Sequence, residues 1–471
     1  MHVTQAGAID GAGTGQDAVY DMVVLGGGSG GYAAALRGAQ LGLRVALVEA
    51  DKVGGTCLHR GCVPTKAILH AAETADAVRE ASAVGIRAAL EGIDMPAVQE
   101  YKNSIVARMY KGLQGLVSSR GIDLVGGWGR LVAPDAVEVA GRHYRGRNVV
   151  LASGSYSKTM GQEISGPVIT SEQALELDHV PASAVILGGG VIGVEFASAW
   201  ASLGSQVTII EALPHLVPNE DEAISKQLER AFRKRRINFR VGTRFESVER
   251  TESGVRVRTA DGAVTEAEVL LIAVGRGPAT ANLGFEEVGV AMDRGFVLTD
   301  PHGRTNVPGV WAVGDIVPGV QLAHRGFAQG IAVAERIAGL DPEPVDDVKV
   351  PKVTFCEPQI ASVGLSEARA AELHGAENIV TSQFNVAGNA KSQILGTQGF
   401  VKLVSLKDGP ILGFHAIGAR MGEQVGEGQL IVSWEADAND VAALVHAHPT
   451  QNETIGEAAM ALAGKPLHNH G

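Results

Sequence analysis

The sequence has few cysteines and aromatic residues, no long apolar run and no positive net charge. Three cysteines among 471 residues are too few for a disulfide-stabilised secreted protein, so we expect a reducing, cytoplasmic setting. No stretch of about 18 apolar residues could form a transmembrane helix. Residues 1–17 lack the basic start and apolar centre of a signal peptide, and we expect a disordered lead-in there. A net charge of -12 argues against nucleic acid as the main partner.

The two closest cysteines lie in the stretch from Gly54 to Lys66. Cys57 and Cys62 are five positions apart, and Gly61 before the second allows a tight turn. Because Pro64 suits the first turn of a helix, we expect Cys62 at a helix N-terminus, where the helix dipole favours a thiolate. A thiol pair on a short loop with one activated member indicates a redox device. The alternatives are a structural pair, two unrelated buried thiols or half of a metal site. His59 lies between the cysteines, but the chain has no second cysteine pair, and we expect no metal.

A strand, a glycine-rich turn and a helix follow one another near the N-terminus. Residues 20–25 form an apolar strand, and Gly26, Gly28 and Gly31 lie in the turn before a helix over about 32–41. A second strand over 45–48 ends at Glu49, which is placed to bind a ribose hydroxyl. The spacing predicts a dinucleotide-binding unit.

The same pattern returns later in the chain. A strand over 184–187 leads into Gly188, Gly190 and Gly193 and a helix to residue 203, and Glu211 follows the next strand. In both copies the acid lies 23 positions after the first glycine (49 − 26 and 211 − 188). The sequence therefore predicts two bound dinucleotides. Because a carboxylate repels a 2′-phosphate, Glu211 favours NAD over NADP in the second site.

The remaining part of the chain supplies three further features. Asp315 ends the TNVPGVWAVGD stretch after a buried strand, where ligands collect in such sheets, although a helix cap is an alternative. From about residue 350 an α+β domain begins, and we expect Cys356 to lie buried and inert in a strand. Near the end, HAHPTQNE places His448 five residues before Glu453, a plausible acid/base pair; a capping box from Thr450 and a surface histidine are the alternatives.

The GGTCLHRGCVPTK stretch, the two glycine turns, TNVPGVWAVGD and HAHPTQNE together resemble the FAD-dependent pyridine nucleotide-disulfide oxidoreductases, from about residue 20 to the end. The resemblance implies two Rossmann-like α/β domains, which bind FAD and NAD, and a C-terminal α+β dimerisation domain. The expected boundaries are 18–154 and 280–349 for FAD, 155–279 for NAD and 350–471 for dimerisation. The positions that would bind FAD are Gly26, Gly28, Gly31, Glu49, Gly55, Thr56, Lys66, Gly129, Ser153, Gly154, Asp315 and Ala323. Those that would bind NAD are Gly188, Gly190, Val191, Ile192, Gly193, Glu195, Glu211, Gly275 and Arg276.

The resemblance also implies roles in catalysis. Cys57 would exchange with the substrate and Cys62 would face the flavin, the two forming a redox disulfide. Lys66 would pair with Glu195. In a homodimer, His448 and Glu453 would complete the partner subunit's site. The implied reaction is oxidation of protein-bound dihydrolipoamide to lipoamide with reduction of NAD.

The implied partner is the lipoyl domain or acyltransferase core of a 2-oxo acid dehydrogenase complex, with no membrane. Glutathione-reductase-like activity is the nearest rival, although those relatives use NADP and Glu211 stands against it. A role chiefly as an assembly subunit is a further alternative. His59 and Arg60 depart from the residues that relatives often carry between the cysteines, and Ser153 replaces a commoner threonine.

Overall fold

The first parallel sheet is built around the apolar strand β1 (Tyr20–Leu25). In the computed structural model, which describes residues 19–469, the strand order is β3-β2-β1-β6, with β19 on the far side of β6. The first half of β6 also pairs with an antiparallel hairpin. These strands are β2 (Val45–Glu49), β3 (Asp123–Gly126), β6 (Arg142–Leu151) and β19 (Val310–Ala312), and the hairpin is β4 (Gly129–Ala133) and β5 (Ala136–Val139).

Alternate residues of β1 face opposite sides of this sheet, as the strand period of two requires. Met22 and Val24 pack in the cluster that helices cover, whereas Val23 and Leu25 pack in the cluster on the hairpin side. The covering helices are α1 (Ser29–Gln40), α4 (Met95–Ser119) and α8 (Ala323–Ile337). Both faces of the sheet are therefore buried, which explains why β1 is almost entirely apolar.

The second nucleotide-binding fold has a five-stranded parallel sheet in the order β11-β10-β9-β15-β8. A three-stranded antiparallel sheet, β12-β13-β14, belongs to the same part of the chain. The parallel strands are β8 (Val168–Thr170), β9 (Ser183–Leu187), β10 (Gln206–Ile210), β11 (Asn238–Arg240) and β15 (Val269–Ile272). The other elements are α5 (Ser171–Ala174), α6 (Val191–Leu203), α7 (Glu222–Lys234), β12 (Phe245–Thr251), β13 (Gly254–Thr259) and β14 (Val264–Ala267).

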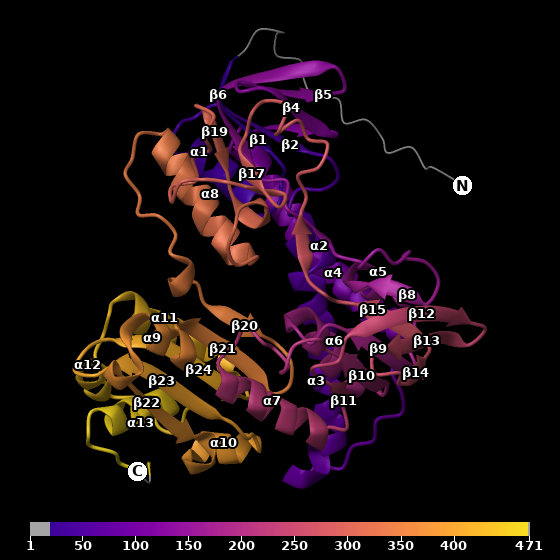
Figure 1. Cartoon of the computed structure of the whole chain (residues 1–471), viewed down its shortest axis with the longest axis vertical. Coiled ribbons are helices and arrows are strands. Elements are labelled where there is room, and N and C mark those ends of the chain that lie inside the picture. Colours follow the sequence, from indigo (N-terminus) through magenta and orange to yellow (C-terminus); the bar gives the residue numbers. More distant parts are fainter. Residues whose placement is uncertain (1–18, 470–471) are drawn as a thin grey trace.

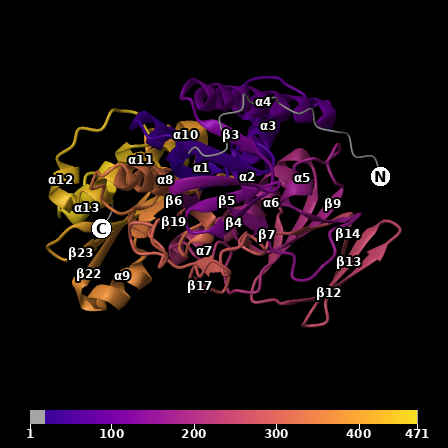
Figure 2. The ribbon, with the colours of Figure 1, turned by 90° about the horizontal axis from the view of Figure 1, so that it is seen from above.

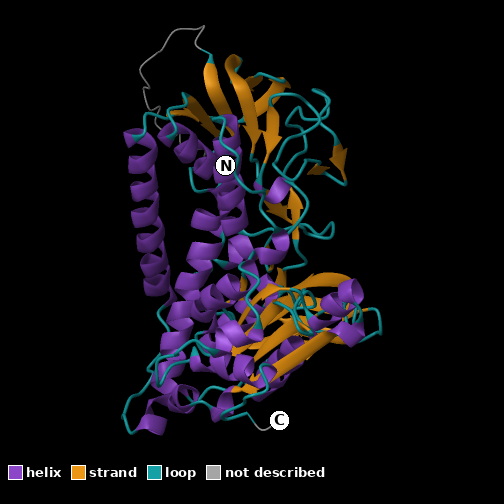
Figure 3. Cartoon of the chain, turned by 90° about the vertical axis from the view of Figure 1, so that its left-hand side faces the viewer, coloured by secondary structure: helices purple, strands orange, loops and turns teal. Residues whose placement is uncertain are grey.

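Two short connecting strands, which we call the crossing strands because the chain passes between the folds along them, and two long helices join the nucleotide-binding folds. β7 (Ser155–Ser157) pairs with β16 (Arg276–Pro278), so the chain leaves the first fold and returns to it at one place. The helix α3 (Cys62–Glu80) packs against α6 and beside α4. Long helices run along one side of the molecule between two groups of strands (Figure 3). Between α3 and α4 lie a 3-10 turn (Ala81–Val84) and a loop.

The C-terminal domain is an antiparallel sheet in the order β20-β21-β24-β23-β22, with helices around it (Figure 1). Its strands are β20 (Lys352–Thr354), β21 (Gln359–Gly364), β22 (Ile379–Asn385), β23 (Phe400–Leu406) and β24 (Ile411–Gly418). Its helices are α9 (Glu367–His374), α10 (Ala390–Leu395), α11 (Met421–Ser433), α12 (Ala438–Ala442) and α13 (Glu453–Leu462). The expected fold class, two Rossmann-like domains and an α+β domain, is confirmed.

Cys356 is buried as expected, but it does not lie within a strand. It follows the end of β20, and its thiol donates to the Pro358 carbonyl oxygen at 3.2 Å. The lead-in expected over 1–17 lies outside the described residues. Within residues 19–469, no helix has the length and hydropathy needed to cross a bilayer.

Candidate active site

The two cysteines lie on either side of a break between two helices. Cys57 is in the short helix α2 (Gly55–Arg60), and Cys62 is the first residue of α3. The prediction that both cysteines lie on a short loop is therefore wrong for Cys57, which lies in a helix. This helix begins after a turn in which Gly54 (φ 110°) and Gly55 (φ 57°) have left-handed backbone. Gly61 lets the backbone pass close to Thr56, since a Cβ atom on Gly61 would lie only 3.0 Å from the Thr56 carbonyl oxygen.

The two sulfur atoms differ in acidity. Both cysteines are free thiols, and the hydrogen bond between their side chains lowers the pKa of Cys62 to about 7 and raises that of Cys57. Burial also raises the pKa of Cys57. The Lys66 ammonium group contributes to the lowering at Cys62, in keeping with a thiolate at a helix N-terminus beside a cation. In the reduced pair, Cys62 is therefore the thiol that ionises first, with Cys57 as its hydrogen-bond donor.

A partly buried ion pair lies one helical turn beyond Cys62. Lys66 Nζ is 2.9 Å from both carboxylate oxygens of Glu195, which is nearly inaccessible on α6. The backbone amide of Phe355 donates to the same carboxylate at 2.9 Å, and the ammonium group lies 4.8 Å from the Phe355 ring centroid. The cation is therefore held by a carboxylate and an aromatic face at once.

The two glycine turns have the same geometry. Gly26 (φ 106°) and Gly188 (φ 102°) have left-handed backbone. A Cβ atom on Gly26 would lie 2.2 Å from the carbonyl oxygen of Ala152, directly after the neighbouring strand β6, and one on Gly188 would lie 2.4 Å from that of Ala273, directly after β15. By contrast, a Cβ on Gly190 would meet nothing within 4 Å, and one on Gly28 only the Gly55 Cα at 4.0 Å. The middle glycine of each turn thus leaves backbone open to a phosphate, beside helices α1 and α6.

The acids that follow the glycine turns are also equivalent. Glu49 accepts from the amides of Gly27 at 2.7 Å and Asp51 at 2.8 Å. Glu211 accepts from the amides of Gly189 at 2.6 Å and Leu213 at 2.7 Å. Each carboxylate oxygen keeps a second lone pair, so both acids can still accept a ribose hydroxyl. The residues present fit one dinucleotide in each turn.

The other residues expected at the cofactors lie around the crossing strands. The Ser153 hydroxyl is buried without a partner, and Gly154 after it has an open Cβ position. Ser155 donates to Asp315 at 2.5 Å. A buried hydroxyl without a partner fits a ligand that supplies one. Of the remaining positions, Thr56 lies in α2, Gly129 begins β4, Ala323 begins α8, Val191 and Ile192 begin α6, and Gly275 precedes β16.

Arg276 was expected at NAD, and its guanidinium group contacts the crossing strand. Its Nε donates to the Ser155 hydroxyl and its Nη2 to the Ser155 carbonyl oxygen, each at 2.7 Å. Through Ser155 it is linked to Asp315 on the side of the first fold. Arg276 therefore ties the two folds together where they meet.

His448 and Glu453 are paired, and they lie away from the cysteines. His448 Nδ1 is 2.7 Å from Glu453 Oε1, and the Thr450 amide donates to Oε2 at 2.7 Å. Burial alone would raise the pKa of Glu453, but these two hydrogen bonds lower it. Thr450 does not form the capping box considered above, since its hydroxyl donates to Ala447 and α13 begins only at Glu453. In Figures 1 and 2, α13, which begins at Glu453, lies apart from α2, which contains Cys57.

Two contacts, one at the redox cysteines and one at the Lys66–Glu195 ion pair, were not anticipated from the sequence. Ser29, within the first glycine turn, is hydrogen-bonded to Cys57 and lowers its pKa, although the net shift is upward. Phe355 meets Lys66 and Glu195 from the C-terminal domain. Ser29 could have been found as the one polar side chain in the turn, whereas nothing near Phe355 in the sequence signals its role.

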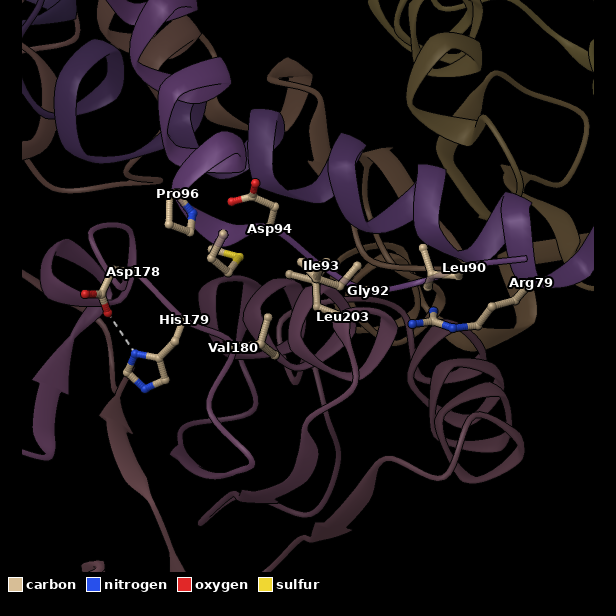
Figure 4. A pocket seen from close by; sticks show the side chains of 11 residues that line it. Arg79, Leu90, Gly92, Ile93, Asp94, Pro96, Asp178, His179, Val180 and Leu203 are labelled. Carbon is tan, nitrogen blue, oxygen red and sulfur yellow. Dashed lines mark hydrogen bonds and ion pairs between the residues drawn. The ribbon is translucent and has the colours of Figure 1, made fainter. Parts of the chain in front are cut away.

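A separate cavity of about 560 Å³ lies between the start of α4 and the second fold. Arg79, Asp94, Asp178 and His179 line it, and His179 Nδ1 is 2.9 Å from Asp178 Oδ1 (Figure 4). His179 Nε2 is also 2.7 Å from Glu268 Oε1. Neither redox cysteine borders this cavity, so it is not part of the thiol site. Among residues 19–469, no group of three or more His, Cys, Asp or Glu side chains could hold a metal ion.

Comparison with known proteins gives matches along nearly the whole chain. Residues 20–330 match the family model described as pyridine nucleotide-disulphide oxidoreductase, and residues 350–459 match the dimerisation domain of that family. The dihydrolipoyl dehydrogenase of Bacillus subtilis is 36% identical, over 95% of this chain and 99% of that protein. Dihydrolipoyl dehydrogenase 3 of Pseudomonas aeruginosa is 37% identical, over 96% and 99%. The crystal structure of LpdA from Mycobacterium tuberculosis superposes with a TM-score of 0.87 at 26% identity, over 94% of this chain and 99% of that one.

Proposed function

Because the chain belongs to the pyridine nucleotide-disulphide oxidoreductase family, we propose that it oxidises dihydrolipoamide to lipoamide and reduces NAD. It is an oxidoreductase that uses FAD and NAD. The observation that carries the proposal is the Cys57–Cys62 pair, with the pKa of Cys62 lowered to about 7 beside Lys66. Similarity to curated dihydrolipoyl dehydrogenases over 95% of the chain supports this substrate.

The two glycine turns divide the cofactors between the two folds. The first turn, Glu49, Ser153 and Asp315 would bind FAD, and the second turn and Glu211 would bind NAD. When bound, FAD accepts two electrons from the thiol pair and supplies a hydride to NAD. The protein holds the cofactors in place, and its carboxylate at Glu211 favours a nucleotide without a 2′-phosphate.

The difference in pKa sets the direction of thiol exchange. One dihydrolipoamide thiolate attacks the Cys57 sulfur of the enzyme disulfide, and the sulfur–sulfur bond breaks with Cys62 leaving as the thiolate. Cys62 is the better leaving group because its pKa is the lower of the two. The second substrate thiol then attacks the substrate sulfur that is bonded to Cys57 in the mixed disulfide. This step expels Cys57, which takes a proton. Lipoamide is released, and the enzyme pair carries the two electrons.

The proton from the substrate thiol needs a base, and we assign that role to His448. Glu453 fixes its Nδ1 by a 2.7 Å hydrogen bond, so Nε2 is the nitrogen that accepts the proton. The His448 side chain is 72% exposed within one chain. We therefore assign it to the thiol site of a second copy in a homodimer. The match to a dimerisation domain and the exposed apolar residues Trp434 (77%) and Val445 (97%) support this arrangement.

The physiological substrate is proposed to be a lipoyl group carried by a 2-oxo acid dehydrogenase complex. The similarity to dihydrolipoyl dehydrogenases supports dihydrolipoamide chemistry, and the choice of complex is inferred from that chemistry alone. A reductase for a small disulfide is disfavoured, since such a reaction with NADPH would place a 2′-phosphate beside Glu211.

The direct test compares two assays of the purified holoenzyme. We expect NAD-linked oxidation of dihydrolipoamide to be fast, and NADPH-linked reduction of glutathione disulfide to be negligible. Cys57→Ser should abolish the first activity while the protein keeps its bound flavin, because the residues of the glycine turn are unchanged. Turnover of dihydrolipoamide by C57S, or faster glutathione reduction by the wild type, would contradict the proposal.

A further inference from the structure

The segment that carries His448 is held at both ends by one carboxylate. Residues 446–452 are the last part of the segment between α12, which ends at Ala442, and α13, which begins at Glu453; Glu427 lies on α11. His446 Nε2 lies 2.7 Å from Glu427 Oε1, and Asn452 Nδ2 donates to Glu427 Oε2 at 2.6 Å. His448 lies between these two attachments. We call residues 446–452 the arch: both of its ends are hydrogen-bonded to Glu427, and it carries the His448 imidazole.

The attachment at His446 is much less accessible than His448 itself. The His446 and Glu427 side chains are 12% and 21% exposed, against 72% for His448. The hydrogen bond to Glu427 raises the pKa of His446, which favours an imidazolium–carboxylate pair. Charge-assisted hydrogen bonds of this kind are about twice as strong as neutral ones. The partly buried His446–Glu427 pair therefore fixes one end of the arch, and the exposed His448 side chain is accessible to substrate.

Helix α13 closes the arch from the other side. A Cβ atom added to Gly456 would lie 2.6 Å from His446 Nδ1, so only glycine lets the ring pack there. The same helix begins with Glu453, which binds His448. Helix α13 thus contacts both histidines, His446 through Gly456 and His448 through Glu453. We therefore expect a displacement of His446 to move Glu453 and with it His448.

We propose that Glu427 is a positioning residue, which acts through His446 and Asn452 to hold His448 at the angle that proton transfer requires. The proposal rests on the proposed function, in which His448 is the base. Glu427 does not touch the substrate. Its two oxygen atoms accept from two partners and carry the charge that favours the His446 imidazolium. Glu427→Gln removes that charge and keeps one acceptor, and its amide group can donate only to a neutral His446 imidazole and not to Asn452 Nδ2.

The test is a double-mutant cycle with H448Q, measured on the dimeric holoenzyme. Misplacement of a catalytic group by about 1 Å costs on the order of 100-fold, so we expect E427Q to lower kcat for dihydrolipoamide oxidation by a factor of about 10 to 100. In the H448Q background, E427Q should have no further effect, since the group that it positions is gone. Glu423→Gln is the matched control on the same helix, where the side chain is exposed, and it should leave kcat unchanged.

Gly456→Ala gives a second route to the same displacement without a change in charge. It should lower kcat similarly and should also have no effect in H448Q. A kcat for E427Q equal to that of E423Q, or multiplicative losses in the E427Q/H448Q double variant, would overturn the positioning role. Wild-type turnover by H448Q alone would overturn the proposed base itself. The two failures are therefore distinct.

Discussion

The ammonium group of Lys66 on α3 donates to both carboxylate oxygens of Glu195 on α6, each at 2.9 Å. This pair links the helix that starts at Cys62 to the helix that follows the second glycine turn. Lys66 lowers the pKa of Cys62, whereas Glu195 raises it. The hydrogen bond with Cys57 is the main cause of the lowered pKa of Cys62, and the Lys66 ammonium group held by Glu195 adds to it.

Removal of this cation should make the Cys62 thiolate harder to form. Below a pH of about 7 Cys62 gains a proton, and above it the thiolate predominates. In Lys66→Met, we expect the midpoint to rise by on the order of one pH unit, because a nearby positive charge is lost. The measurement is the rate of alkylation of Cys62 in the reduced protein as a function of pH, followed by mass spectrometry. Lys111→Met, at an exposed position on α4, serves as control. An unchanged midpoint in K66M would refute the assigned effect.

The carboxylate of Glu211 should determine the choice of nucleotide. Replacement by glutamine removes the charge and weakens the hydrogen bond to a ribose hydroxyl, so KM for NAD should rise about tenfold. Activity with NADP should fall less or rise, since the repulsion of its 2′-phosphate is lost. Steady-state kinetics with both nucleotides checks this. The equivalent Glu49→Gln should reduce FAD content and leave KM for NAD in the flavin-loaded fraction unchanged. Equal effects of E211Q on NAD and NADP would contradict the role.

The third cysteine should be dispensable. Burial raises the pKa of Cys356 well above its usual value, and its thiol donates only to the Pro358 carbonyl oxygen. A serine keeps that donor, so Cys356→Ser should retain kcat, and Cys356 should resist alkylation in the native protein. Loss of dihydrolipoamide oxidation in C356S, with the fold intact, would show that a third thiol takes part.

Features that depend on spacing along the chain could be predicted from the sequence. These features are local in the sequence: the two glycine turns, the acid 23 positions after each turn begins, and the helix that starts at Cys62. The structure shows the same backbone geometry in both glycine turns. Strand β22 has only Ser382 and Phe384 buried, so its apolar signal is too weak to be recognised. The helix at Cys57 was missed because its start depends on the positive φ angles of two glycines.

Contacts between distant segments could not be predicted in the same way. Phe355 reaches Lys66 and Glu195 only because the C-terminal domain packs against both nucleotide-binding folds. Arg276 binds Ser155 because β16 pairs with β7, which no local pattern encodes. Likewise, Glu427 meets His446 and Asn452 across 19 and 25 positions. Local propensity carries no information about such pairings.

The most direct measurement combines two inactive chains. H448Q should lose activity by a factor on the order of 100 to 10,000, as expected for removal of a general base, and C57S should be inactive. If each thiol site takes its imidazole from the neighbouring chain, a mixed dimer of the two variants has one intact site. Re-association of equal amounts should then restore about a quarter of the wild-type rate. If Cys57 and His448 of the same chain worked together, both sites of the mixed dimer would be defective and no activity would return.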